Sequence, residues 1–171
     1  MKRTLTGLIF LQILLGCLLL LILLPVISSW IHAPALADLS RLAFAPFCHQ
    51  LPGRSFALAG VKLAVCARCA GIYLGMFLGI QGIATSAFAK ATADRKVART
   101  MMMNKTVLIP ILLMAADGFL NWFGIIDTPG WARFLLGLGF GFASGRLLGF
   151  GVSDLIEMLG DEREWKTGNI T

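Results

Sequence analysis

Charged residues are scarce in this chain, and acidic ones most of all. Charged residues make up 14% of the 171 residues and hydrophobic residues 57%, with 9 acidic against 15 basic side chains. Soluble domains carry roughly a quarter charged residues, so this composition argues against a water-soluble domain. It predicts a chain surrounded by lipid, of a length that suits one compact bundle.

A basic surface interleaved with aromatic residues is also missing. The formal net charge of +6 invites a nucleic-acid interpretation, but the lysines and arginines stand at the ends of apolar segments and in the loops between them. Membrane topology explains that placement better than nucleic-acid binding does. We therefore expect membrane lipids as partners and no nucleic acid.

Long apolar runs, in contrast, are plentiful. A bilayer core needs about 20 apolar residues per helix, and several segments meet this requirement. We therefore predict an all-α integral membrane protein, in which residues 1–171 form one domain built as a bundle of about four transmembrane helices. The expected spans are about residues 5–30, 70–88, 106–126 and 133–152. The expected connections are a Cys/His loop over 31–69, a basic loop over 89–105 and a C-terminal tail over 153–171.

The first apolar segment has a second interpretation. Lys2 and Arg3, a long apolar run and then Ala35-Leu36-Ala37 resemble a signal peptide with its cleavage site. The run is longer than the about 7 to 15 residues of a usual signal core, however, and residues 31–34 separate it from the Ala-x-Ala motif. A retained transmembrane helix is therefore favoured, and in both cases the chain from residue 38 onward emerges on the outer side.

Orientation follows from the lysines and arginines of the short loops. The segment between the second and third spans is strongly basic, with Lys90, Arg95, Lys96, Arg99 and Lys105 against Asp94 alone. Together with Lys2 and Arg3, it predicts that both termini are cytoplasmic and that the Cys/His loop is extracytoplasmic. The Cys/His loop also contains basic residues, which would argue for a cytoplasmic position of that loop. Their excess is smaller and more spread out, so it counts for less.

Glycine recurs at every fourth position in two of the expected spans. The two series are Gly71, Gly75 and Gly79, and Gly137, Gly141, Gly145 and Gly149. Such a series lines one face of a helix and allows two backbones to approach closely. We therefore expect the second and fourth spans to pack tightly, either within one chain or across a homo-oligomer.

Three cysteines and one histidine gather in the Cys/His loop. They are Cys48, His49, Cys66 and Cys69. Three thiols and an imidazole complete a tetrahedral Cys3His site, and such soft ligands suit zinc. The two-residue gap of the Cys-x-x-Cys pair lets both sulfurs converge on one ion, and a turn at Pro52-Gly53 allows the first two ligands to join them. Zinc is therefore the expected cofactor.

Other interpretations of the cysteines stay open. A Cys-x-x-Cys pair at a helix N-terminus has a lowered thiol pKa, so Cys66 and Cys69 also fit a membrane thiol–disulfide oxidoreductase. In an oxidising compartment, Cys48 would instead bond to one of them as a structural disulfide, which leaves one thiol over. A third class is a structural or assembly factor, in which the glycine faces recruit a partner. Whether the chain is an enzyme is left open by these patterns.

Polar residues within the spans form a second candidate site. Asp117 lies near the middle of the third span, and Asn121 follows one helical turn later on the same face. A carboxylate at that depth is costly and should face a partner inside the bundle. The residues expected at the same outer end are Tyr73, Arg68 and Arg133, with Arg54 above them. Together they predict either an ion pair that locks the bundle or a pocket where arginine binds an anionic group such as phosphate.

Several of these motifs occur together in a recognisable order. They are Cys48-His49-Gln50, Pro52, Arg54-Ser55-Phe56 and Cys66-Ala-Arg68-Cys69-x-Gly71-Ile-Tyr73-Leu-Gly75, then Asp117-Gly118 and the stretch from Arg133 to Gly141. The set resembles the signature of the membrane protein family called domain of unknown function 2085, over roughly residues 45–150. One departure is Ala70, where the family usually has threonine. The resemblance implies a small multi-pass protein of a prokaryotic plasma membrane, and it implies no particular activity.

These observations lead to one functional hypothesis. We expect the outer loop to bind zinc through its cysteines and His49, above the polar pocket. If the metal is catalytic, it would act as a Lewis acid, with Asp117 or His49 as the proton carrier. The arginines around the pocket predict a lipid or a lipid-linked phosphate as the substrate.

Overall fold

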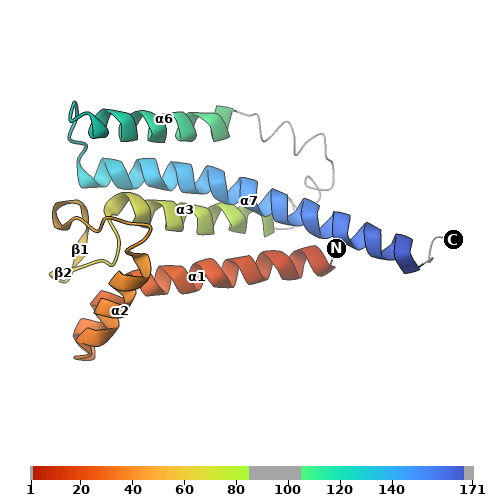
Figure 1. Ribbon diagram of the computed structural model, residues 1–171, viewed down its shortest axis with the longest axis horizontal. Coiled ribbons are helices and arrows are strands. Elements are labelled where there is room, and N and C mark those ends of the chain that lie inside the picture. The colour runs from red at the N-terminus through yellow and green to blue at the C-terminus, as the bar shows by residue number, and fades with distance from the viewer. Residues whose placement is uncertain (1, 85–104, 168–171) are drawn as a thin grey trace.

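The computed structural model describes residues 2–84 and 105–167, which are mostly helical. The helices are α1 (Lys2–Trp30), α2 (Pro34–Phe44), α3 (Ala67–Ala84), α6 (Lys105–Trp122) and α7 (Gly130–Thr167). α1, α3, α7 and α6 lie side by side in that order, and α2 turns away from the end of α1 (Figure 1). The segment between α2 and α3 lies at the same end of the bundle as the α6–α7 connection (Figure 1). Residues far apart in the sequence therefore meet at this end.

Two of the described helices are long and apolar enough to cross a membrane by length and composition, over Thr6–Trp30 and Gly130–Ile156. A shorter apolar stretch, Val107–Trp122, lies in α6. The structure thus supports a mostly helical protein with two candidate membrane-spanning helices. The end of the expected second span and the basic loop up to residue 104 lie outside the described residues, as do residues 168–171.

α6 ends earlier than the expected third span, which continued through residue 126. Gly124 lies just past the last turn with a φ of +68°, a backbone conformation that glycine adopts without steric cost. The N–H of Ile125 donates to the carbonyl of Leu120 (3.0 Å), and the N–H of Gly124 donates to that of Asn121 (3.2 Å). This is the hydrogen-bond pattern of a Schellman motif, so the helix stops short of the expected boundary.

α3 and α7 pack backbone to backbone along their glycine faces. A Cβ added at Gly141 would lie 2.8 Å from both the Cα and the carbonyl carbon of Ile72, and one at Gly75 would lie 2.7 Å from the backbone nitrogen of Phe142. The glycines that approach the facing helix in the same way are Gly71, Gly79, Gly137 and Gly145. The expected packing of the two glycine-bearing segments is confirmed, and it is formed within one chain.

The Cys/His loop contains more secondary structure than the sequence predicts. It holds α2, a single 3-10 turn η1 (Pro52–Arg54), and an antiparallel hairpin of β1 (Ala57–Leu58) and β2 (Val61–Lys62). The hairpin turn is formed by Ala59 and Gly60, with φ values of 49° and 79°. Positive φ at both central residues is characteristic of the type I′ turn, a common two-residue hairpin turn. The expected loop is therefore a folded segment.

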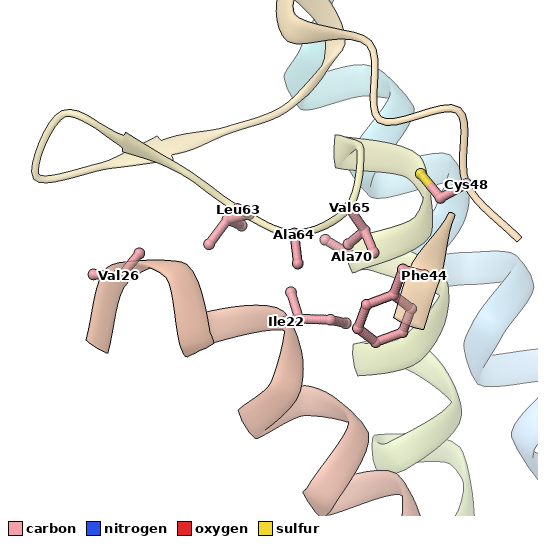
Figure 2. Packing of buried hydrophobic residues seen from close by; sticks show 8 residues of the cluster. All are labelled: Ile22, Val26, Phe44, Cys48, Leu63, Ala64, Val65 and Ala70. Carbon is pink, nitrogen blue, oxygen red and sulfur yellow. The ribbon is translucent and has the colours of Figure 1, made fainter. Parts of the chain in front are cut away.

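A hydrophobic cluster joins this segment to α1 and α3. Its buried members are Ile22, Val26, Phe44, Cys48, Leu63, Ala64, Val65 and Ala70 (Figure 2). Pro25 lacks an N–H and interrupts the hydrogen bonding of α1. Beside it, the N–H of Ala64 donates to the carbonyl of Ile22 (3.3 Å). The stretch that leads into Cys66 is therefore fixed by burial and by a backbone hydrogen bond to α1.

Candidate functional site

Three thiols meet where α2 and the stretch before α3 come together. The sulfur atoms of Cys48, Cys66 and Cys69 all lie within 4.8 Å of one another, and none of the three forms a disulfide. The backbone N–H of Cys66 donates to Sγ of Cys48 (3.2 Å). The structure thus brings together the three sulfur ligands expected from the sequence.

Local structure fixes each of these thiols. The N–H of Cys48 donates to the carbonyl of Phe44 (2.9 Å) in the turn after α2, and its buried side chain lies beside the first turn of α3 (Figure 2). Cys66 directly precedes α3, and Cys69 lies in its first turn. Because the N–H of Ala70 donates to the carbonyl of Cys66 (3.0 Å), the helix itself sets the distance between the paired cysteines.

The thiols of Cys48 and Cys69 differ in acidity. Hydrogen bonds with the side chains of Cys66 and Cys69 hold the pKa of Cys48 well below the usual thiol range, although burial opposes this effect. The pKa of Cys69 is raised by its hydrogen bonds with Cys48 and Cys66 and by its burial. The arrangement favours a thiolate at Cys48 that accepts from two thiols, and the thiolate is the form that binds metal.

His49 follows Cys48 in the sequence but does not join the sulfur atoms in space. Its side chain is exposed, and within the described residues the group able to hold a metal consists of the three cysteines. Gln50 turns the chain here with a φ of 49°, and its side-chain amide donates to the carbonyl of Arg41 (2.6 Å). His49 lines the same cavity as the cysteines, and its role as the fourth ligand stays a prediction.

Polar residues of α3, α6 and α7 converge at this end of the bundle. The buried carboxylate of Asp117 pairs with Nη2 of Arg68. Nδ2 of Asn121 donates to Oδ1 of Asp117 (3.0 Å), while Oδ1 of Asn121 accepts from Nη2 of Arg133 (2.8 Å). One hydrogen-bonded network therefore joins three helices through two residues of α6.

Two loop residues that were not expected at the site complete this network. Oγ1 of Thr128 donates to Oδ1 of Asp117 (2.5 Å) and accepts from Nδ2 of Asn121 (2.9 Å). Oδ1 of Asp127 accepts from Nη2 of Arg133 (2.7 Å). Both loop residues directly precede Pro129 and the start of α7. An Asp or Thr followed by Pro is a helix-start signal, and that signal was available in the sequence.

A cavity of about 440 Å³ lies between the thiols and the polar network. Its walls include the three cysteines together with His49, Arg54, Arg68, Asn121 and Arg133. Tyr73, which was expected at this site, does not line the cavity. It packs edge to face against Phe44 with ring centroids 5.6 Å apart, within the hydrophobic cluster. The structure thus places soft metal donors and three arginines around one cavity and leaves Tyr73 outside it.

These features define a mostly helical protein with two candidate membrane-spanning helices and a cluster of three cysteines beside a polar cavity. The chain belongs to the family described as "Predicted membrane protein (DUF2085)", which matches residues 48–147. Every residue predicted for the site lies within that match. Membership of this family and the two apolar helices agree with a location in a membrane.

Related proteins occur in archaea. The chain is 41% identical over 96 residues to an uncharacterised protein of Methanocaldococcus jannaschii, and the match covers 56% of each protein. It is 32% identical over 104 residues to an uncharacterised protein of Methanothermobacter thermautotrophicus, covering 60% of this chain and 86% of that protein. The chain thus spans little more than half the length of the first relative. No solved structure matches it.

Proposed function

We propose that Cys48, Cys66 and Cys69 bind a zinc ion at the outer end of a membrane bundle, and that the adjoining cavity accepts a lipid phosphate or a lipid-linked phosphate. The observation that carries the proposal is the approach of the three sulfur atoms to within 4.8 Å of one another. Zinc with Zn–S bonds of about 2.3 Å in tetrahedral geometry holds its sulfurs roughly 3.8 Å apart. The three thiols therefore suit such an ion after small side-chain movements.

The donor set fits zinc better than a hard cation, since thiolates prefer soft or borderline metals. The N–H of Cys66 donates to Sγ of Cys48, and a bond of this kind orients a ligand sulfur. His49 in the fourth position would make the site structural, whereas an open fourth position would make zinc a Lewis acid toward the substrate.

We also propose that α1, α3, α6 and α7 each cross the membrane. Their side-by-side arrangement supports this (Figure 1). So do large apolar side chains exposed on α1, α6 and α7, such as Phe10, Phe119 and Leu135. The basic residues of 89–105 support a cytoplasmic position for the end of the bundle where α3 ends and α6 begins. The thiols would then lie on the outer side of a prokaryotic plasma membrane, with both termini inside.

Residues of the cavity wall supply the remaining groups that this function needs. Arg54, Arg68 and Arg133 line the cavity, and guanidinium groups bind phosphate through paired hydrogen bonds. The carboxylate of Asp117 is engaged with Arg68, so we assign it an orienting role. His49, which is exposed on the cavity wall, is the group that we assign to proton transfer when zinc keeps an open position.

Elemental analysis of the detergent-purified chain tests the metal site. We expect about one zinc per chain, and none in the Cys66→Ser, Cys69→Ser double variant, because one remaining thiolate cannot hold the ion. Cys17→Ser is the matched control, since this exposed free thiol lies on α1, away from the cluster. It should retain the zinc of the wild type. A wild-type protein without metal would contradict the proposal.

A thiol–disulfide oxidoreductase is the second candidate, which the close approach of the free thiols of Cys66 and Cys69 favours. Alkylation followed by mass measurement separates the two functions. Metal-bound thiols should gain alkyl groups after a chelator is added, whereas a redox pair should gain them only after a reductant. A zinc-containing protein that binds no phosphate would instead fit the third class, a structural or assembly factor.

A further inference from the structure

A second cavity adjoins the first at the N-terminus of α7. It has a volume of about 400 Å³, and its walls include the α6–α7 loop and Gly130 in the first turn of α7. Arg54, Asn121 and Arg133 line both cavities. The second cavity is therefore separated from the one beside the thiols by these three side chains.

Arg133 carries an unusual charge arrangement at this boundary. The residue is 4% exposed, and its Nε is a buried donor without a hydrogen-bond partner among the described residues. Nη2 donates to the neutral amide of Asn121 and to Oδ1 of Asp127, a carboxylate whose side chain is 91% exposed. Buried polar groups in native proteins are nearly always hydrogen-bonded. A buried guanidinium that lines the cavity thus has an Nε unpartnered within the described part of the chain and a solvent-exposed carboxylate as its counter-ion.

Two further features make this cavity attractive to an anion. The N–H of Arg133 donates to the carbonyl of Pro129 (3.0 Å), so the N–H groups that precede it in α7 have no partner inside the helix. Such a helix start favours negative charge. Arg54 also lines the cavity, is exposed, and forms no ion pair with any residue that the structure describes.

We propose that the second cavity binds a phosphate group between Arg54, Arg133 and the first turn of α7, and that Asp127 occupies this place until phosphate displaces it. The inference rests on the proposed function, because Arg54 and Arg133 line both cavities and the second cavity extends the proposed phosphate site. Asp127 suits such exchange because it belongs to the α6–α7 loop and its carboxylate faces solvent. Once phosphate has bound, it replaces the carboxylate of Asp127 as the charged acceptor for Nη2 of Arg133.

Titration with inorganic phosphate by calorimetry, on the detergent-purified full chain, tests this inference. Asp127→Asn should bind phosphate about tenfold more tightly than the wild type, because it removes the competing charge and keeps an oxygen acceptor for Arg133. Arg54→Gln should bind about tenfold more weakly. Arg41→Gln is the matched control and should change nothing. Arg41 is a partly exposed arginine of α2 that pairs with Asp38 and lines neither cavity.

The same variants in nanodiscs of phosphatidylcholine with phosphatidic acid identify the source of the phosphate. In Asp127→Asn, a larger gain in affinity for phosphatidic acid than for inorganic phosphate supports a lipid ligand, and equal gains for both probes support a soluble one. Unchanged or weaker binding of both probes by Asp127→Asn, or no effect of Arg54→Gln, would overturn the inference.

Zinc content measured on each sample keeps the two proposals separate. Phosphate binding that persists in the zinc-free Cys66→Ser, Cys69→Ser variant would leave the phosphate site standing without the metal site. Full zinc content with unchanged phosphate binding in Asp127→Asn and Arg54→Gln would leave the metal site standing without the phosphate site.

Discussion

Replacing Gly141 with alanine is expected to destabilise the bundle by about 3 kcal/mol or more, the upper part of the range for overpacked cores. The new Cβ would lie 2.8 Å from the Cα and the carbonyl carbon of Ile72 and would overlap its carbonyl oxygen. Backbone atoms cannot rotate away as the end of a flexible side chain can, so α3 and α7 would have to separate. If both helices cross the membrane as proposed, close packing is their main attraction, and separation removes it.

Thermal unfolding in detergent, followed by circular dichroism, measures this effect. A chain of this size loses roughly 2–4 °C in Tm for each kcal/mol, so a fall of about 6–12 °C is expected. Gly151→Ala in the same helix is the control, since nothing lies within 4 Å of its added Cβ. Alanine also has the higher helix propensity, so this variant should be as stable as the wild type or more stable. Equal Tm values for Gly141→Ala and the wild type would contradict the close helix contact.

Much of the helical bundle could be predicted because its signals are local. Apolar runs mark the helices, and glycine at every fourth residue marks the faces that meet. α2 was missed because it is a short helix with only a few buried residues, among them Ala37 and Phe44, and its packing against α1 and α3 is not visible in the sequence. The end of α6 was placed too late because Gly124 is followed by further apolar residues. A Schellman motif depends on the glycine conformation rather than on hydropathy.

The candidate site was predictable to a similar extent. The approach of Cys66 and Cys69 follows from their spacing on one helical turn. The burial of Asp117 was expected because an unpartnered carboxylate within an apolar helix is costly. The position of His49 depends instead on the turn at Gln50, which tertiary contacts decide. Thr128 before Pro129 marks a helix start, but nothing in the sequence indicates its hydrogen bonds with Asp117 and Asn121.

Replacing Asp117 with alanine is expected to cost about 3–5 kcal/mol, the usual penalty for removing one partner of a buried ion pair. The Arg68 side chain is 25% exposed, and its Nε has no hydrogen-bond partner among the described residues. Without Asp117, Arg68 would lose its counter-charge, and Thr128 and Asn121 would lose their acceptor at Oδ1. The control is Asp38→Ala, which breaks the exposed Asp38–Arg41 pair. Thermal unfolding of Asp38→Ala should show that the free energy of unfolding falls by at most about 1 kcal/mol.

A double variant distinguishes loss of charge pairing from loss of hydrogen bonds. Replacing a buried ion pair by apolar residues of similar volume is often neutral, so Arg68→Met with Asp117→Leu should recover most of the stability that Asp117→Ala loses. Recovery would mean that the unpaired guanidinium causes the loss. A double variant as unstable as Asp117→Ala would contradict this explanation, because both lack the Oδ1 acceptor of Thr128 and Asn121 while only one retains the charge. The network through α6 would then hold the bundle by hydrogen bonding, and the ion pair would contribute little.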